Sequence, residues 1–590
     1  MRIQRAIVGV VLLLLAGRME PALNDPLKAV FTERNSEKAW RLEELGSDLP
    51  ADWTGYEYLV LEMKASSPQR FSLWIHTAEG KRRLMIHPLG QGVWMRASVP
   101  LRFFRGRDRQ GMDLASANNR RTDAYWMGVW GPFGDLKNVR ALSVAMDYPL
   151  NAPSLEIRSL ALAKEDAGSE FLEGRPVLDE FSQWAAGDWP RKVRSREQLE
   201  REGAAEALAL AENKAPKVGR FGGFLGTKVE ATGYFRVTRI DRRWWFVDPE
   251  GHLFLSTGAN GIRGESGPDG QSLLARRMKA WGLNTIGNWS GFRPTSEEYR
   301  KAYVTTLGLP RTEPLYLGMP DVYSPDYVRA VEEAAAKQFS PLQDDPWLLG
   351  YFLGNEPPWP GREGEVVEMF LQGPETATKT ALRAYLAQGD TPERRVRFVH
   401  GMFEAYLDLM GRAVRKADPY HLNLGIRFGG IPAEPILKLG RMFDVCSLNV
   451  YEYEPTAALK RFYEVTGRPL LIGEFHFGVP ADGLGAGLVQ TADQTERAKG
   501  YRYYMEQAAA LPCFVGAHWF QWTDEPVLGR RDGENYNIGF VDVMNRPYPE
   551  LVQAARKTHD RLAAIHAGRL SPFGQRPLAS THGTPNSPWD

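Results

Sequence analysis

Two stretches of the chain share one design, an uncharged apolar run that ends at a glutamate. Leu348–Leu353 runs into Gly354-Asn355-Glu356-Pro357-Pro358, and Pro469–Gly473 runs into Glu474-Phe475-His476. A continuous apolar run bounded by turn-forming residues is typical of a fully buried strand of a parallel sheet. The pattern therefore predicts two buried strands, each with a carboxylate at its carboxyl end.

From Phe221 onward, strand-like runs alternate with helical stretches, which is the signature of βα repeats. Eight such units predict an α/β fold, a (β/α)8 TIM barrel, in which the carboxyl ends of the strands meet at one face. Strands one to three are predicted at Leu253–Ala259, Asn284–Gly287 and Pro314–Leu317, and strands four and seven end at Glu356 and Glu474. Strands five, six and eight are predicted at Leu422–Ile426, Val445–Val450 and Phe514–Trp519, and helices at Leu273–Ala280, Pro325–Lys337, Thr376–Ala387 and Val396–Lys416.

The two glutamates suit glycoside hydrolysis, which needs a pair of carboxyl groups on either side of the scissile bond. Phe352, Leu353 and Trp359 surround Glu356 in the sequence, and an apolar setting raises the pKa of a carboxyl, as a general acid requires. We therefore predict that Glu356 is the acid/base and Glu474 the nucleophile. The alternative is that either glutamate caps a helix or pairs with an arginine at the barrel rim.

Further polar and aromatic side chains follow the predicted strands and are expected at the same face. Tyr451 is predicted to donate a hydrogen bond to Glu474, and one of Trp519 and Trp522 to form the floor of a sugar site. Asn355 is placed to hold a sugar hydroxyl. The other candidates for substrate contacts are Trp289, Arg427, His476 and His518, each of which has a structural role in the barrel as its alternative.

The region before the predicted barrel has a different pattern of apolar and polar residues. Short runs with partial alternation, separated by turn signals, predict a β-sandwich or jelly roll over residues 25–165. This region is either a carbohydrate-binding module or a domain that buttresses the barrel. Residues 166–218 are predicted as a connector with a helix at Ser195–Glu212, residues 219–567 as the barrel, and residues 568–590 as a disordered tail.

Composition excludes several classes of protein. The net charge is +1 over 590 residues, so nothing favours nucleic acid or an anionic membrane as a partner. The two cysteines form no disulfide framework, and the ten histidines show no metal-ligand spacing, so no metal or other cofactor is expected.

The first residues are typical of an export signal. Arg2 and Arg5 precede the apolar run Ala6–Ala16, which is shorter than the span of about 20 residues that crosses a bilayer. We predict a signal peptide over residues 1–22, a secreted or periplasmic location and no integral membrane span. The alternative is an uncleaved anchor or a mis-assigned start.

Several motifs resemble those of known enzymes. GNEPPW (Gly354–Trp359) and GEFHFG (Gly473–Gly478) are similar to the acid/base and nucleophile motifs of the clan of retaining (β/α)8 glycosidases. More narrowly, the chain resembles glycoside hydrolase family 50, the β-agarases. The stretches that carry this resemblance are Phe181–Lys192, Trp244–Asn260, Asp418–Phe428 and His518–Val543, the last of which contains DGENYNIGF.

The resemblance implies an enzyme that cleaves β-1,4 linkages of agarose or neoagaro-oligosaccharides with retention, so that the expected partner is a galactan chain or oligosaccharide. It carries over Glu356 as acid/base and Glu474 as nucleophile. It also implies substrate contacts for Asn260, Asn288, Asn355, Arg427, Tyr451, His476 and Trp519. Two alternatives stay open, namely the same chemistry on another galactan or β-galactoside, and a non-catalytic carbohydrate-binding protein built on the same barrel.

Overall fold

The computed structural model describes residues 22–578, except 47–48, 107–118, 123, 130, 175, 213–217, 264–267, 295, 311 and 531. The predicted signal peptide therefore lies outside the described residues, apart from its last position. Among the described residues, no helix has both the length and the apolar character needed to cross a bilayer.

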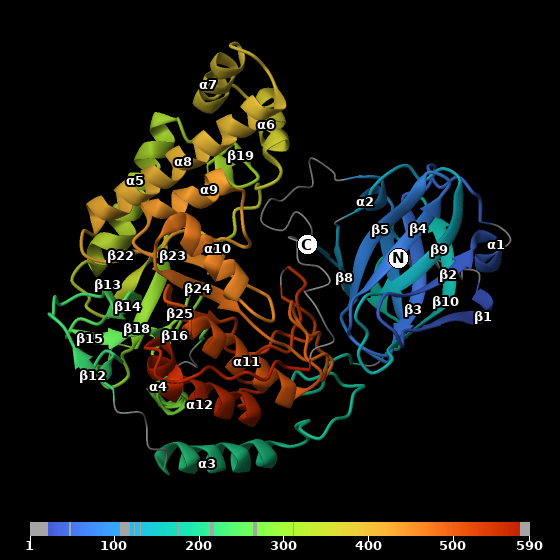
Figure 1. Cartoon of the computed structure of the whole chain (residues 1–590). Coiled ribbons are helices and arrows are strands. Elements are labelled where there is room, and N and C mark those ends of the chain that lie inside the picture. The colour runs from blue at the N-terminus through green and yellow to red at the C-terminus, as the bar shows by residue number, and fades with distance from the viewer. Residues whose placement is uncertain are drawn as a thin grey trace, which may run out of the picture.

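A curled sheet of eight parallel strands organises the larger part of the chain (Figure 1). The chain is thus an α/β protein. Phe428, a few residues beyond one end strand, forms a parallel bridge with Leu448 of the other end strand. In spatial order the strands are β22 (Leu422–Asn423), β21 (Leu348–Phe352), β18 (Ala302–Thr306), β17 (Thr285–Ile286), β16 (Ser256–Ala259), β25 (Phe514–Trp519), β24 (Leu470–Phe475) and β23 (Cys446–Asn449).

Helices lie on the outside of this sheet and share one large apolar core with its strands (Figure 1). The longest, α8 (Pro392–Ala417), begins after Thr391, whose hydroxyl accepts the N–H of Arg394 at 3.3 Å as an N-cap. The other helices are α4 (Pro268–Trp281), α5 (Pro325–Phe339), α6 (Glu363–Gln372), α7 (Ala377–Leu386), α9 (Glu434–Lys438), α10 (Thr456–Thr466), α11 (Gln494–Ala509) and α12 (Pro549–His566), with 3-10 turns η1 (Ser340–Leu342) and η2 (Leu439–Met442).

The predicted third strand is wrong. The third parallel strand is β18, whereas Pro314–Leu317 contributes β19 (Leu315–Tyr316), which forms a two-stranded hairpin with β20 (Met319–Pro320). Leu317 and Gly318 have φ of 51° and 77°, so the chain turns back at once and cannot continue as a long strand.

The predicted first strand is divided between two sheets. Its first half is β15 (His252–Phe254), and only the second half, β16, joins the parallel sheet. β15 belongs to a four-stranded antiparallel sheet with β12 (Phe224–Lys228), β14 (Arg243–Val247) and β13 (Arg236–Ile240). Phe246 and Phe254 of this sheet are buried in the same core as the parallel strands.

Two antiparallel sheets make up the N-terminal region, drawn in blue in Figure 1. They share one apolar core, to which each sheet contributes buried side chains. The first sheet has the order β1 (Ala22–Val30), β10 (Ser154–Ala163), β3 (Tyr58–Ala65), β6 (Met95–Pro100) and β11 (Glu170–Phe171). The second has β2 (Ser36–Arg41), β9 (Val139–Met146), β4 (Phe71–Thr77), β5 (Gly80–Pro88), β8 (Tyr125–Gly128) and β7 (Asn119–Arg121), and two short helices, α1 (Leu42–Leu45) and α2 (Arg102–Arg105), lie between strands.

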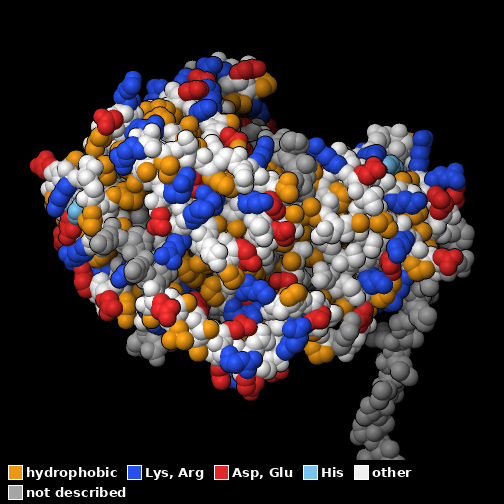
Figure 2. All heavy atoms as spheres, turned by 60° about the horizontal axis from the view of Figure 1, so that its bottom comes forward, with side chains coloured by type: hydrophobic (Ala, Val, Ile, Leu, Met, Phe, Trp, Pro, Cys, Tyr) orange, Lys and Arg blue, Asp and Glu red, His pale blue; other side chains and the backbone are white. Residues whose placement is uncertain are grey.

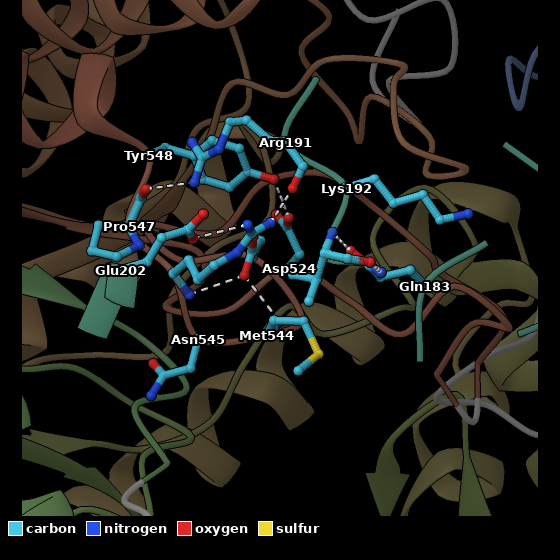
Figure 3. Close-up of polar contacts among 12 residues, drawn as sticks. Gln183, Arg191, Lys192, Glu202, Asp524, Met544, Asn545, Pro547 and Tyr548 are labelled. Atoms are coloured by element: carbon cyan, nitrogen blue, oxygen red, sulfur yellow. Dashed lines mark hydrogen bonds and ion pairs between the residues drawn. The ribbon is translucent and has the colours of Figure 1, made fainter. Parts of the chain in front are cut away.

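The connector is bound to the loop between β25 and α12. Arg191 lies 4.8 Å from the ring of Tyr548 and donates from Nη2 to the carbonyl of Pro547 at 2.8 Å (Figure 3). Tyr548 in turn donates its hydroxyl to Asp524 at 2.6 Å. Lys192 donates to three backbone carbonyls of the connector, at 2.6 to 3.2 Å. Lys192 therefore helps to fold the connector, and Arg191 attaches it to the parallel-sheet body.

The connector helix α3 (Arg196–Glu212) buries none of its side chains. It is held by ion pairs instead, since Glu206 accepts two hydrogen bonds at 2.7 Å from Arg277 of α4. Figure 2 shows one face of the molecule, over which acidic and basic side chains are interspersed.

The chain beyond α12 differs from the predicted loose tail. Leu578 donates its N–H to Glu496 at 2.6 Å, and Phe573 donates its N–H to Glu506 at 2.9 Å. Both glutamates are buried on α11 and need donors, which the backbone of this segment supplies. Residues 579–590 lie outside the described part of the chain.

Candidate active site

Glu474 lies near the carboxyl end of β24, where three side chains from three other strand ends donate to it. Oε1 accepts from Arg427 Nη2 at 2.6 Å and from Trp289 Nε1 at 3.0 Å. Oε2 accepts from the hydroxyl of Tyr451 at 2.6 Å, the hydrogen bond that the sequence predicts. Two neutral donors and one cation hold this carboxylate in place and stabilise its negative charge.

Glu356 follows β21 and has a much sparser environment. Its Oε1 accepts from Asn449 Nδ2 at 2.7 Å. Although part of its side chain reaches solvent, the surrounding protein desolvates the carboxyl, and this burial, reinforced by the negative charge of Glu474, raises its pKa to about 7. The hydrogen bond from Asn449 and the charge of Arg427 act in the opposite direction and are outweighed.

Three residues of this site adopt left-handed backbone conformations. Glu356, Arg427 and Trp289 have φ of 42°, 50° and 60°. Non-glycine residues rarely adopt positive φ, and such strain is concentrated at functional sites. The N–H of Glu356 donates to the carbonyl of Arg427 at 3.1 Å, so two of these residues hold each other.

Asn449, at the end of β23, is a site residue that the sequence argument missed. It connects the two strand ends, because its Nδ2 reaches Glu356 and also the Oδ1 of Asn355 at 3.2 Å. The only signal for it in the sequence is its place as a lone amide closing an apolar strand. Gly473 makes room for it, since a Cβ there would lie 2.7 Å from both Asn449 Oδ1 and Arg427 Nε.

Several predicted contact residues are instead buried beneath the carboxylates. His518 is fully buried, with Nε2 at 2.8 Å from Ser256 Oγ, and Asn260 donates to the carbonyl of Gly473 at 2.9 Å. Trp519 donates to the carbonyl of Ile538 at 2.8 Å and has no exposed surface. Because these side chains have almost no exposed surface, they offer no face to a sugar. Their hydrogen bonds join neighbouring segments of the parallel-sheet body instead.

The other predicted contact residues divide into two groups. Trp522 is stacked on Trp281 with the ring centroids 5.1 Å apart, and it is buried. His476 is buried with both ring nitrogens hydrogen-bonded to the backbone. Trp289, by contrast, is 47% exposed and, with its N–H on Glu474, forms part of the open side of the site. The expectation of an aromatic sugar platform therefore fits Trp289 rather than Trp519 or Trp522.

Polar atoms without protein partners gather around the carboxylates. Among the described residues they include Arg427 Nη1, Asn288 Nδ2 and Asn449 Oδ1. Buried polar groups are normally hydrogen-bonded, and these atoms have almost no accessible surface, so an ordered water rather than a sugar is the partner that they can take.

A third carboxylate, Glu534, also acts on the site and was not predicted. It is paired with Arg530, which in addition lies 2.9 Å from Asp532 and 3.3 Å from Glu525. Burial raises the pKa of Glu534 to about 7, with the charge of Glu474 as one of the contributing causes. Within the described ranges, no cluster of three or more histidine, cysteine or acidic side chains is arranged to hold a metal ion.

No model of a known protein family matches the chain. Among curated proteins, it is 26% identical over 569 residues to β-agarase B of Vibrio sp. (strain JT0107), a match covering 72% of this chain and 59% of that protein. It is 28% identical over 365 residues to β-agarase A of the same organism, covering 51% of this chain and 37% of that protein. The chain therefore spans less than two thirds of the length of these relatives.

Solved structures share the fold. An exo-β-agarase matches 92% of this chain and 98% of its own with a TM-score of 0.65 at 22% identity. The agarase AgWH50C matches 87% of this chain and 92% of its own with a TM-score of 0.64 at 22% identity. PfGH50B matches 93% of this chain and 100% of its own with a TM-score of 0.62 at 21% identity. Together with the two curated relatives, these matches confirm the resemblance drawn from the motifs: the chain is similar to β-agarases and shares its fold with solved proteins of glycoside hydrolase family 50.

Proposed function

We propose that the protein is a retaining glycoside hydrolase that cleaves β-1,4-galactosidic linkages of agarose or neoagaro-oligosaccharides. The observation that carries the proposal is the contrast between the two carboxyls. Glu474 accepts hydrogen bonds from Arg427, Tyr451 and Trp289, whereas burial raises the pKa of Glu356 to about 7. One group faces three donors, among them a cation, and the other can carry a proton near neutral pH, which suits the division of labour that glycoside hydrolysis requires.

In the first step, a carboxylate oxygen of Glu474 attacks the anomeric carbon. The bond from that carbon to the glycosidic oxygen breaks, and Glu356 delivers its proton to the departing oxygen. The product is a glycosyl ester on Glu474, and Glu356 is left ionised. Arg427 and Tyr451 hold the nucleophile in position while it forms the bond to the anomeric carbon and loses its negative charge.

In the second step, Glu356 removes a proton from a water molecule that attacks the same carbon. The ester bond to Glu474 breaks, and the sugar leaves with its original anomeric configuration. Asn449 donates to Glu356 and stabilises its ionised form, which is the form that accepts the proton of the water.

The substrate class is inferred from relatives. The curated matches are named β-agarases, and one solved structure is described as an exo-β-agarase. The exposed ring of Trp289, next to Glu474, suits a sugar face. Since agarose is a polymer outside the cell, we further propose a secreted or periplasmic enzyme.

The same proposal extends to the architecture. We assign a (β/α)8 catalytic barrel to residues 219–567 and a carbohydrate-binding-module-like β-sandwich to residues 25–165, joined by a connector at 166–218. The bridge between Phe428 and Leu448 supports closure of the parallel sheet, and the shared core of two antiparallel sheets supports the sandwich.

Product analysis tests the function. Wild type and Glu474→Ala are incubated with agarose, neoagaro-oligosaccharides and a panel of other galactans, and the products are separated and identified. Proton NMR during the first minutes records the anomeric configuration of the new reducing end. We expect neoagaro-oligosaccharide products with the β configuration from wild type, and none from the variant.

Other outcomes are equally informative. Cleavage of a different β-galactoside, lost in Glu474→Ala, keeps the mechanism and rejects agarose as substrate. An initial α product rejects retention. A wild type that binds these glycans without cleaving any of them supports the non-catalytic carbohydrate-binding alternative.

A further inference from the structure

A single peptide unit links the N-terminal region to the active site. Arg70, the residue that precedes β4, donates from Nη2 to the carbonyl of Gly487. The N–H of the same peptide, that of Leu488, donates to Nε2 of His476 at 2.8 Å. The Gly487–Leu488 peptide is therefore fixed on both edges, by an arginine on one side and a histidine on the other.

This contact defines the state of His476. Because Nε2 accepts the N–H of Leu488, the ring proton must be on Nδ1, which lies 3.0 Å from the carbonyl of Phe520 and donates to it. Burial holds the pKa of His476 at about 3, so the ring is neutral at physiological pH. With both nitrogens used, His476 has one orientation.

The ring of His476 packs against the residue that holds the nucleophile. Its centroid is 4.7 Å from that of Tyr451, whose hydroxyl donates to Glu474 at 2.6 Å. A shift of the imidazole therefore changes the packing of the phenol and the direction of its hydrogen bond. Gly487 permits this close arrangement, since it has φ of 73° and a Cβ there would lie 2.6 Å from His476 Nε2.

The N-terminal region also supports His476 through the ring of Tyr536. Arg70 lies 5.9 Å from the ring of Tyr536, which in turn lies 6.2 Å from the ring of His476. Trp126 and Leu89, both from the N-terminal region, share a small buried cluster with Tyr536. Arg70 thus contacts both the loop beside His476 and the aromatic ring next to it.

We propose that Arg70 is a positioning residue for the hydrolysis, acting through the Gly487–Leu488 peptide and His476 on Tyr451. The inference rests on the proposed function. It gives the N-terminal region a role in the chemical step itself, which differs from binding glycan and from general support of the fold. The contacts that connect Arg70 to Glu474 run through the Gly487–Leu488 peptide, His476 and Tyr451.

The test compares three full-length variants with wild type. Arg70→Ala removes the contact, and Arg70→Lys keeps a donor that can reach the carbonyl. Arg158→Ala is the matched control, because Arg158 also donates within the N-terminal region, to Glu62 at 2.8 Å, and stacks on Trp94 at 4.5 Å, away from the parallel sheet. The readouts are kcat and KM on the oligosaccharide that wild type cleaves, the thermal midpoint, and hydrogen exchange at the Leu488 amide.

We expect Arg70→Ala to lower kcat by roughly 10- to 100-fold with KM within about twofold, because small displacements of catalytic groups are costly. The amide of Leu488 should exchange faster, and Arg70→Lys should recover part of kcat. Arg158→Ala should keep kcat within about twofold of wild type, even if its thermal midpoint falls as much as that of Arg70→Ala.

Three results would overturn the inference. They are an unchanged kcat in Arg70→Ala, an equal fall of kcat in Arg158→Ala, and an unchanged rate of exchange at Leu488. An inactive wild type is a separate result, since it rejects the proposed function itself and with it any role of Arg70 in hydrolysis. An active wild type with an unaffected Arg70→Ala variant rejects only the role of Arg70.

Discussion

The ends of β21 and β24 present the same residue type in opposite surroundings. At β24, Glu474 accepts from Arg427, Tyr451 and Trp289 within 3.0 Å. At β21, Glu356 accepts from the amide of Asn449, and burial dominates its electrostatics. Both glutamates follow uncharged apolar strands, so the difference in hydrogen bonding comes from the side chains that other strand ends bring to each of them.

This contrast shows how one sheet can give two carboxyl groups opposite electrostatic surroundings. Donors and a cation stabilise the charged form of a carboxyl, whereas desolvation and a neighbouring negative charge stabilise the neutral form. Arg427 is placed on Glu474 at 2.6 Å, and for Glu356 its favourable charge is outweighed by burial. The position of one arginine thus contributes to the difference between the two surroundings.

The largest effect should come from removing the carboxylates themselves. We expect Glu474→Gln to lower kcat by more than about 1,000-fold on every substrate, because no other group can attack the sugar. Glu356→Gln should lose roughly 100- to 10,000-fold on oligosaccharides but far less on aryl glycosides whose phenol leaves without a proton. Steady-state kinetics with both substrate types measures this, and an identical response of the two variants to the leaving group would contradict the assignment.

Replacing Arg427 should reduce the electrostatic difference between Glu474 and Glu356 and should also lower the free energy of unfolding. Arg427 is fully buried, and Arg427→Met leaves Glu474 buried without its cation, which should lower the free energy of unfolding by about 3 kcal/mol and reduce kcat by about 100-fold. Arg277→Met is the control, because Arg277 is equally buried but pairs with Glu206 on the connector. Urea unfolding and kcat should show both variants destabilised and only the first one inactive, whereas equal kcat values would place Arg427 outside the mechanism.

Removing one neutral donor should have a smaller effect. Tyr451→Phe keeps the ring and deletes the 2.6 Å hydrogen bond to Glu474, so kcat/KM should fall by about 10- to 100-fold, as expected for a hydrogen bond to a charged group. Tyr504→Phe deletes a hydroxyl that donates to the carbonyl of Val450 at 2.7 Å and should leave kcat/KM nearly unchanged. The same loss in both variants would mean that packing, not the donor, is responsible.

The smallest effect concerns pH. Glu356 must be protonated in the first step and its pKa is about 7, so kcat/KM should fall as the pH rises through about 7. The hydrogen bond from Asn449 lowers that pKa, so Asn449→Ala should move the alkaline limb upward, by about one pH unit or less. A pH profile of kcat/KM for both proteins tests the sign, and a limb that moves downward would contradict it.

Local sequence patterns predicted a good part of the framework. The apolar runs located β21, β24 and β25, because a strand buried on both faces leaves a continuous signature. The third parallel strand was missed because β18, AYVTT, ends in threonines and lacks an uninterrupted apolar run. Pro314–Leu317 contains apolar residues as well, but the turn at Gly318 confines it to a hairpin.

A contact in the site could be predicted from the sequence only where the position of a residue at the end of its strand was enough to place its side chain. Tyr451 was placed on Glu474 because adjacent parallel strands bring their ends together. Asn449 was missed, and His518 and Trp519 were candidates for substrate contacts, because a strand pattern does not show whether a terminal side chain points toward the open end or into the core. That direction depends on the tilt and register of the neighbouring strands.

By itself, the sequence determined which segments form buried strands and that two of them end in glutamates, because burial and chain reversal act over a few residues. Only the tertiary structure decided that Arg427 joins Glu474, that Asn449 joins Glu356, and that Arg70 reaches Gly487 from a different region. These contacts join residues far apart in the chain, and their chemistry depends on distance, burial and neighbouring charge, none of which is a local property.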